Sequence, residues 1–226
     1  MGQIFNMTNP DDDLGGLFAD QGAPPLEPEP EDDLRPRYDE HTALVIVDVQ
    51  NDFADPGGSL FVSGGPEVVK ATNVEIAEAT AAGAFVVYSQ DWHPPATPHF
   101  VTGGGQWPVH CVRDTWGAEY HADLVVDGPT VRKGTGGEDG YSAFTMADPE
   151  SGETSSTGLA DLLEERHIER VVVVGLALDV CVKATALDAH SLGFTTTLVR
   201  AASAPVVESD GERTVATLAR IGVAIA

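Results

Sequence analysis

From residue 43 onward, short apolar runs alternate with longer stretches in which apolar and polar residues are mixed. The runs "ALVIVDV" (43–49) and "VVVVGL" (171–176) are apolar on both faces and rich in β-branched residues, which is typical of strands inside a parallel sheet. Four further strands are predicted at 84–89, 130–133, 194–200 and 223–226.

The stretches between these runs carry the end signals of helices. In the first of them Pro66 suits the opening turn and Gly83 ends the helix. Strands that alternate with helices predict a three-layer α/β fold, in which a mostly parallel sheet of about six strands has helices on both faces. The predicted helices are 65–83, 157–167, 180–193 and 209–222.

Residues 1–40 lack this pattern. They hold eleven acidic residues and two arginines, with many prolines and few apolar side chains. Such a composition does not support a core of its own. We therefore expect an irregular, acidic, Pro-rich N-terminal arm at 1–40 and a single folded domain at 41–226.

The formal net charge of −24 restricts the partners of the chain. A field this negative repels nucleic acid, because binding there depends on Lys and Arg that neutralise phosphates. Adaptation to high salt would produce such an acidic surface, and a generic soluble surface is the alternative. No apolar run approaches the roughly 20 residues that cross a bilayer, and the N-terminus lacks a secretory pattern. We expect a cytoplasmic protein without a membrane partner.

Ligands and catalytic groups of such sheets gather beyond the carboxyl ends of the strands. Four polar or reactive side chains fall at these ends, and we expect them to meet at one edge of the sheet. They are Asp48, Asp91, Lys133 and, in the turn after the fourth strand, Cys181.

The segment "DWHPPATPHF" (91–100) predicts a metal site. Asp91 and His93 are two residues apart, so an extended chain directs both to one face. His99 follows a proline-stiffened loop, and His110 lies in "WPVHC". Imidazole nitrogens with one carboxylate suit zinc, iron or manganese. The alternative is a set of solvated loop histidines.

A second group predicts nucleophilic chemistry. In a reducing cytosol Cys111 and Cys181 are not expected to form a disulfide. Cys181 is predicted at the start of a helix, where the helix dipole would lower the pKa of the thiol. Asp48 ends an apolar run, where a carboxylate needs a partner, and Lys133 would provide one. Cys181, Asp48 and Lys133 together would form a nucleophile, a base and an orienting cation. The alternatives are a packed core cysteine and a structural Asp48–Lys133 pair.

The Gly-rich run "GTGGEDGYSAF" (134–144) lacks the spacing of a phosphate-binding loop. We interpret it as a flexible loop that carries Tyr141 to the site.

Five segments together resemble the nicotinamidase/pyrazinamidase branch of the isochorismatase-like cysteine hydrolases: "ALVIVDVQNDF", "DWHPPATPHF", "WPVHC", "RKG…YSAF" and "GLALDVCVKATALDA". The resemblance runs from residue 43 to the C-terminus, and the acidic arm lies outside it. It implies an isochorismatase-like hydrolase domain at 41–226. It also implies a cysteine amidohydrolase of NAD salvage that converts nicotinamide, and also pyrazinamide, to the acid and ammonia through a thioester on Cys181.

The resemblance also implies roles for individual residues. The implied catalytic triad is Asp48, Lys133 and Cys181, and the implied oxyanion hole is the backbone N–H groups of Ala177 and Cys181, with a cis peptide between Leu176 and Ala177. The implied ligands of one divalent metal ion, zinc before iron or manganese, are Asp91, His93, His99 and His110. The implied substrate contacts are Phe53, Trp107, Tyr141 and Leu176.

Two departures from the family pattern, Leu178 and Val180, make the rim of the site more apolar and leave the amide preference open. The competing hypotheses are isochorismatase proper, a carbamoyl-sarcosine-type amidohydrolase and a non-catalytic metal-binding scaffold. The set of one carboxylate and three histidines argues against the first two. Cys111 is expected to be a bystander, and the expected partners are a small amide and, as an open question, a second copy of the chain.

Overall fold

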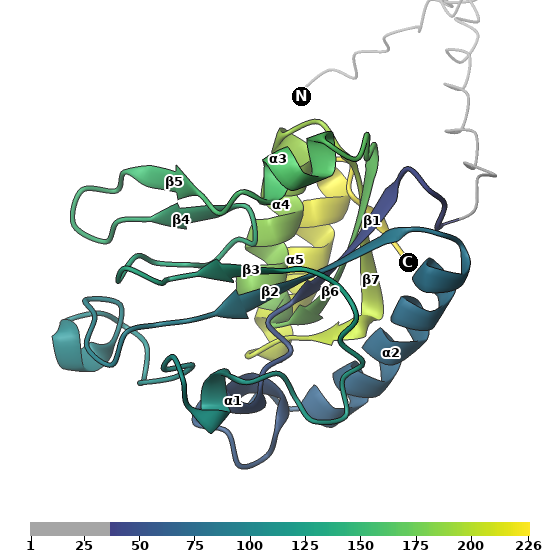
Figure 1. Cartoon of the computed structure of the whole chain (residues 1–226). Coiled ribbons are helices and arrows are strands. Elements are labelled where there is room, and N and C mark those ends of the chain that lie inside the picture. The colour runs from purple at the N-terminus through teal and green to yellow at the C-terminus, as the bar shows by residue number, and fades with distance from the viewer. Residues whose placement is uncertain (1–36) are drawn as a thin grey trace, which may run out of the picture. The chain divides into compact units, whose positions relative to one another are not determined.

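The structure is a computed structural model that describes residues 37–226, so the predicted arm at 1–40 lies almost wholly outside the described residues and its boundary stays a prediction. The described part is built on one six-stranded sheet in the order β3-β2-β1-β6-β7-β8 (Figure 1). Every neighbouring pair in this sheet is parallel, which confirms the predicted α/β fold. The strands are β1 Thr42–Val47, β2 Phe85–Asp91, β3 Thr130–Lys133, β6 Arg170–Leu176, β7 Thr195–Ala204 and β8 Ala224–Ile225.

Four helices lie where the pattern predicts them, within a few residues at each end. They are α2 Gly65–Ala81, α3 Leu159–Glu164, α4 Lys183–Ser191 and α5 Glu208–Arg220. Several short elements were not predicted, because each has too few residues to show a period. They are α1 Asn51–Ala54, two 3₁₀ turns at Val101–Gly103 and Trp116–Ala118, the antiparallel hairpin of β4 Thr145–Ala147 and β5 Thr154–Ser156, and a π-helical turn at Leu178–Val182.

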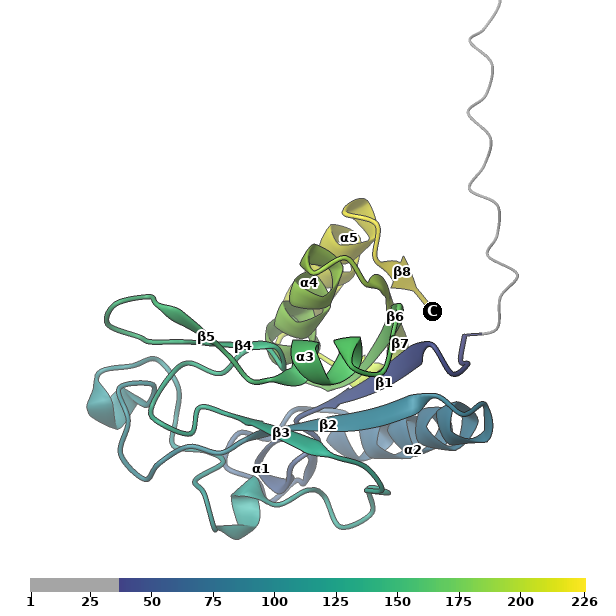
Figure 2. The ribbon, with the colours of Figure 1, turned by 45° about the horizontal axis from the view of Figure 1, so that its top comes forward.

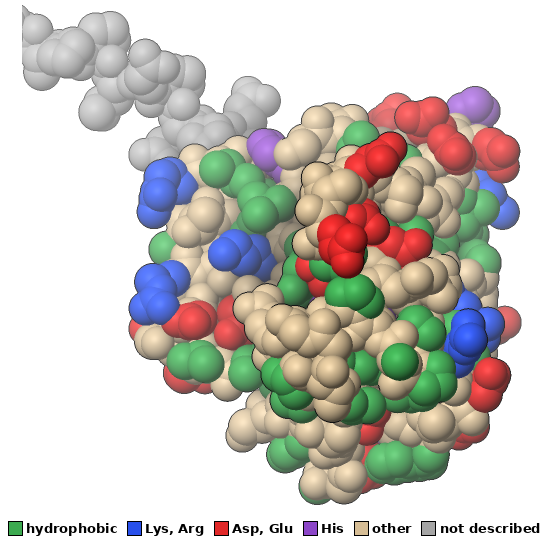
Figure 3. Space-filling view, turned by 90° about the vertical axis from the view of Figure 1, so that its left-hand side faces the viewer, with side chains coloured by type: hydrophobic (Ala, Val, Ile, Leu, Met, Phe, Trp, Pro, Cys, Tyr) green, Lys and Arg blue, Asp and Glu red, His purple; other side chains and the backbone are tan. Residues whose placement is uncertain are grey.

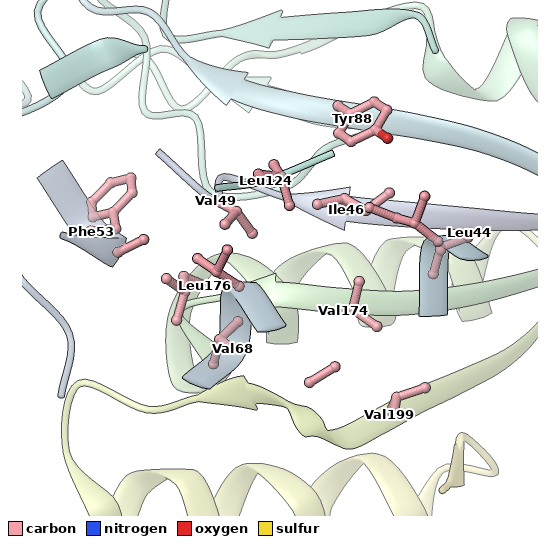
Figure 4. Close-up of a cluster of buried hydrophobic side chains, with 14 of the residues drawn as sticks. Leu44, Ile46, Val49, Phe53, Val68, Tyr88, Leu124, Val174, Leu176 and Val199 are labelled. Atoms are coloured by element: carbon pink, nitrogen blue, oxygen red, sulfur yellow. The ribbon is translucent and has the colours of Figure 1, made fainter. Parts of the chain in front are cut away.

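Side chains that alternate along β1 enter two separate cores, as expected of a strand buried on both faces. Leu44 and Ile46 pack with Val68 of α2 on one side of the sheet (Figure 4). Val45 and Val47 pack on the other side with residues of α3, α4 and α5. Figure 2 shows α2 on one face of the sheet and α4 and α5 on the other. The two cores hold the central strands rigidly, and with them the strand ends where the site lies.

A glycine lets β1 and β6 approach closely just below that edge. Gly175 has a φ of +116°, and a Cβ there would lie 2.1 Å from the carbonyl oxygen of Val47. A side chain at this position would therefore separate the two strands. Within the described residues, no helix is both long and apolar enough to span a membrane.

Candidate active site

Three strand ends bring the predicted charged residues together. Asp48 follows β1 directly, and its φ of +48° turns the chain out of the strand. Asp91 and Lys133 are the last residues of β2 and β3, and they are register partners in the parallel ladder. Because parallel strands end at one edge of a sheet, the three side chains meet although they are far apart in sequence.

Lys133 is the centre of this group. Its Nζ lies 2.7 Å from Oδ2 of Asp48 and 2.5 Å from Oδ1 of Asp91. The same Nζ lies 3.7 Å from Sγ of Cys181 and donates to the carbonyl oxygen of Gly140. Lys133 and Asp48 are completely buried. We call Lys133 with Asp48, Asp91 and Cys181 the lysine centre.

The ion pairs decide the protonation states inside the lysine centre. Burial lowers the pKa of Lys133, but the two carboxylates outweigh it and hold that pKa well above its ordinary value. Burial raises the pKa of Asp91, but Lys133 and the neighbouring histidines hold it well below the ordinary range. Burial raises the pKa of Asp48 to about 6 against the opposing effect of Lys133. Asp48 is thus the carboxylate that is poised to exchange a proton near neutral pH.

The expectation of a helix-activated thiolate at Cys181 is wrong for this structure. Burial raises the pKa of the thiol well above its ordinary value, and Lys133 offsets this only in part. Cys181 also lies inside the π-helical turn rather than at the first residue of α4. The thiol is neutral at rest and needs a base, and oxygens of Asp48 and Asp91 lie within 4.8 Å of its sulfur.

The three predicted histidines form a second group, which we call the histidine centre together with Asp91. One ring nitrogen each of His93, His99 and His110 lies within 4.8 Å of the others, and all three side chains are buried. Oδ2 of Asp91 lies 3.7 Å from Nε2 of His93 and 3.7 Å from Nε2 of His110. Asp91 therefore belongs to both centres, with one oxygen facing Lys133 and the other facing the histidines.

Hydrogen bonds at Nδ1 fix the orientation of two of the histidine rings and leave a lone pair on the other ring nitrogen of each. Nδ1 of His110 lies 2.7 Å from the carbonyl oxygen of Pro108, and Nδ1 of His99 lies 2.5 Å from Oδ1 of Asp139. A carbonyl or carboxylate oxygen only accepts, so Nδ1 carries the proton and Nε2 keeps its lone pair. Neither ring nitrogen of His93 has a hydrogen-bond partner among residues 37–226.

These observations test whether the residues suit a metal. Unpartnered buried nitrogens are costly, and a cation bound by them would remove that cost. Three imidazoles with one carboxylate form a donor set for zinc, iron or manganese. Gly134 makes room for this arrangement, since a Cβ at its φ of +70° would lie 2.4 Å from the ring of His93. The residues therefore fit a divalent metal ion.

A pocket of about 400 Å³, measured with its open mouth, joins the two centres to the surface. Asp91, His99, His110 and Cys181 line it together with Ala177. The expected aromatic contacts Phe53, Trp107 and Tyr141 also line it, and Nε1 of Trp107 donates to the hydroxyl of Tyr141 over 2.9 Å. Apolar residues that the sequence did not single out complete the lining, namely Leu60, Val62 and Val206.

Leu176 is the one predicted substrate contact that the structure places elsewhere. Its side chain is fully buried in the core beside α2 and is not among the residues that line the pocket. The reason is that successive side chains of β6 point to opposite faces of the sheet, and this one points to the face covered by α2. The peptide bond that joins Leu176 to Ala177 is cis, as expected. Of the two departures, Val180 lines the pocket, whereas Leu178 packs in the other core.

Three polar residues near the two centres were missed in the sequence. Ser89 donates to Oδ1 of Asp48 over 2.7 Å, and Gln50 holds both backbone groups of Asp91 with its side-chain amide. Ser89 lies two residues before Asp91 on β2, so the strand period could have placed it on the same face. Asp139 lies in the Gly-rich run, where the sequence shows only a loop and gives no signal of a contact with His99.

The isochorismatase domain matches residues 42–225, most of the chain. The chain belongs to the isochorismatase family. Within this family it is 38% identical over 183 residues to the nicotinamidase of Acinetobacter baylyi, a match that covers 72% of this chain and 80% of that protein.

Two solved structures are similar to this chain over nearly all of their own length. The zinc complex of a pyrazinamidase from Pyrococcus horikoshii has a TM-score of 0.74 at 37% identity, covering 82% of this chain and 98% of that one. PnC1 of L. infantum, in complex with nicotinate, has a TM-score of 0.76 at 38% identity, covering 85% and 96%. The isochorismatase-like fold predicted from the sequence is thereby confirmed.

Proposed function

We propose that this enzyme hydrolyses nicotinamide, and also pyrazinamide, to the corresponding acid and ammonia through a thioester on Cys181, as a step of NAD salvage. The observation that carries the proposal is the lysine centre, in which a thiol, a carboxylate and an ammonium meet beside a pocket lined by aromatic side chains. The similarity of the chain to nicotinamidases and to a protein solved in complex with nicotinate supports the choice of substrate.

The first step is proton transfer from Cys181 to Asp48. The thiol is neutral at rest, whereas Asp48, with a pKa of about 6, is ionised at neutral pH and able to accept the proton. Lys133 lies within 3.7 Å of the sulfur and stabilises the thiolate as it forms. The thiolate then attacks the carboxamide carbon, and its electron pair makes the carbon–sulfur bond.

The attack places a negative charge on the carboxamide oxygen. We assign the oxyanion hole to the backbone N–H groups of Ala177 and Cys181. Both residues line the pocket, Ala177 as the N-cap of the π-helical turn and Cys181 within it. Loss of one such donor in other enzymes costs about 3–4 kcal/mol of activation free energy. When the tetrahedral adduct collapses, the carbon–nitrogen bond breaks and Asp48 returns its proton to the leaving nitrogen, which departs as ammonia.

Water completes the reaction. Asp48 is again a carboxylate after ammonia leaves, so it accepts a proton from a water molecule that attacks the thioester carbonyl. The carbon–sulfur bond breaks, the acid is released, and the proton returns to the thiol of Cys181. The net change is one amide and one water converted to one acid and one ammonia.

The histidine centre would hold the divalent metal ion through Asp91, His93, His99 and His110, with zinc favoured by the imidazole-rich donor set. Bound there, such an ion supplies a Lewis acid that can take the lone pair of a pyridine nitrogen and polarise a water molecule. Phe53, Trp107 and Tyr141 would enclose the aromatic ring, and the apolar Val180 at the mouth suits a neutral amide.

The proposed location and partners of the enzyme follow from the same proposal. A small neutral amide requires no charged docking surface, and the net charge of −24 disfavours nucleic acid. We extend the proposal to a cytoplasmic enzyme that acts without a membrane partner. A homo-oligomer stays a prediction that size measurements in solution would test.

The deciding experiment compares nicotinamide with benzamide, which has the same ring shape and carboxamide but lacks the ring nitrogen. We expect nicotinate and ammonia in equal amounts from nicotinamide. For benzamide we expect kcat/KM at least about tenfold lower, because an unmet polar contact in a buried site costs about 1–3 kcal/mol. Absence of ammonia from nicotinamide with metal-loaded protein would refute the proposed reaction. Equal rates for both amides would refute recognition of the ring nitrogen.

A further inference from the structure

One contact of the histidine centre lies outside the four ligands assigned above. Nδ1 of His99 and Oδ1 of Asp139 are 2.5 Å apart, within hydrogen-bond distance, and the acceptor is a carboxylate. The side chain of His99 is 4% exposed, and that of Asp139 is 27% exposed. The carboxylate thus reaches a buried ring from the solvent side, and because it accepts from Nδ1 it leaves the lone pair on Nε2.

The backbone holds Asp139 in place for this contact. Asp139 and Ala147 of β4 exchange both of their backbone hydrogen bonds, at 2.7 and 2.8 Å. The β4–β5 hairpin is itself tied to α4, because the hydroxyl of Thr145 donates to Asp188 over 2.7 Å. Asp139 is therefore attached to the folded domain rather than to a free loop.

The loop that carries His99 is attached to the same segment. The hydroxyl of Thr97 donates to the carbonyl oxygen of Gly137 over 2.9 Å and accepts from the backbone N–H of His99 over 3.2 Å. The ring and its carboxylate partner thus have a fixed spacing. Metal-binding histidines commonly have such an outer partner, which fixes the tautomer and the ring orientation.

The three histidines differ in this respect, which makes a role for Asp139 testable. Nδ1 of His110 donates to a neutral backbone carbonyl, and Nδ1 of His93 has no hydrogen-bond partner among the described residues. Among the three, only His99 has a carboxylate as the acceptor of its Nδ1–H, and it is the one that follows the long proline-stiffened loop. Its orientation is therefore the one that a single substitution can remove.

We propose that Asp139 is a positioning residue for the metal site: it orients His99 and keeps Nε2 free for a divalent cation, and so raises the affinity for that ion. The inference rests on the metal site of the proposed function. Asp139 does not line the substrate pocket, so its effect should appear in metal affinity rather than in the chemistry of the loaded enzyme.

The test measures Zn²⁺ affinity of the metal-free full chain by competition with a chromogenic chelator, for the wild type, Asp139→Ala and Asp139→Asn. We expect Asp139→Ala to bind one Zn²⁺ about 10- to 100-fold more weakly, the range for lost outer partners. Asp139→Asn keeps an oxygen acceptor and should fall between the two. Excess Zn²⁺ should return kcat of both variants to within about twofold of wild type, which a purely structural defect would not allow.

A matched control is Glu150→Ala. Glu150 lines the same open hollow as Asp139 and is exposed, whereas the side-chain hydrogen bond and ion pair of His99 go to Asp139. Figure 3 shows Asp and Glu side chains gathered on the face toward which β4 and β5 project, so a general field effect is the competing cause. Equal weakening by Glu150→Ala and Asp139→Ala would assign the effect to the field and overturn the proposal.

The remaining outcomes separate this inference from the proposed function. Wild-type affinity in Asp139→Asn and Asp139→Ala would overturn the inference and leave the metal site intact. If Asp139→Ala fails to fold, the isosteric Asp139→Asn decides alone, and unchanged affinity in it counts against the proposal. A wild-type chain that hydrolyses nicotinamide yet binds no Zn²⁺ would instead refute the metal site and the inference with it.

Discussion

The lysine centre and the histidine centre share Asp91 but satisfy their polar groups in opposite ways. In the lysine centre the ammonium of Lys133 is paired with two carboxylates, and its charge is balanced inside the protein. In the histidine centre His93 has no hydrogen-bond partner among the described residues, and the free lone pairs of the rings converge. The first is assembled by folding alone, whereas the second, under the proposed function, would be completed by a bound cation.

The difference shows that one carboxylate belongs to both centres. Oδ1 of Asp91 faces Lys133 and Oδ2 faces the histidines, so under the proposed function one side chain would hold the metal site and the nucleophile at a fixed distance. Single substitutions can nevertheless disrupt each centre separately, and their expected effects differ widely in size.

The largest effect should come from Cys181→Ala, which removes the nucleophile but leaves the histidine centre untouched. We expect ammonia release from nicotinamide to fall at least about 10⁴-fold, with metal content unchanged. The control is Cys111→Ala, which removes the other buried thiol and should keep activity within a few fold. Residual turnover near the wild-type rate in Cys181→Ala would rule out the thioester route.

Lys133→Met should damage both centres together. It leaves Asp48 and Asp91 buried without their cation, and removing one partner of a buried ion pair costs about 3–5 kcal/mol of unfolding free energy. Denaturant unfolding measures this loss. Lys70→Met, on the exposed side of α2, should change stability by less than about 0.5 kcal/mol. Similar values for the two variants would mean that Lys133 is not a structural counter-ion.

His93→Ala should empty the histidine centre and spare the lysine centre. We expect Zn²⁺ affinity to fall by more than about 100-fold, beyond the range for an outer partner, while the unfolding free energy of the metal-free protein changes little. The exposed His41 provides a control, since His41→Ala should bind one metal ion as the wild type does. Full metal content in His93→Ala would show that the ligands lie elsewhere.

The pH profile should report on Asp48 alone. A base must be ionised to act, and the pKa of Asp48 is about 6, so kcat/KM should rise with pH up to about 6 and then level off. Ser89 lowers this pKa through its hydrogen bond to the carboxylate. Ser89→Ala should therefore move the acid limb of the profile to higher pH. A limb that stays in place would exclude Asp48 as the titrating base.

The smallest expected effect is that of salt, which should act on the charged surface but not on the two buried centres. The net charge of −24 means that carboxylates on the surface repel one another at low ionic strength. Molar salt screens this repulsion and should raise the unfolding free energy by about 1 kcal/mol. The acid limb of the pH profile should not move, because buried pairs are screened little. Stability that is equal at low and at molar salt would count against adaptation to high salt.

Much of the fold could be predicted because a short β-branched run that is apolar on both faces fits the interior of a parallel sheet and little else. The strands β1, β3 and β6 lie within one or two residues of their predicted bounds. β7 runs to Ala204, four residues beyond its predicted end, where the ladder changes register and the alternation that marks a strand is lost. The β4–β5 hairpin was missed because its strands have three residues each.

The sequence by itself determined which residues stand at the ends of the parallel strands, because hydrophobic pattern fixes where each strand stops and topology sends those ends to one edge. Only the tertiary structure decided how they pair: that Asp91 is shared, that the thiol of Cys181 is neutral, and that Ser89 and Asp139 support the two centres. These properties arise from burial and from contacts between residues far apart along the chain, and neither leaves a local signal in the order of the amino acids.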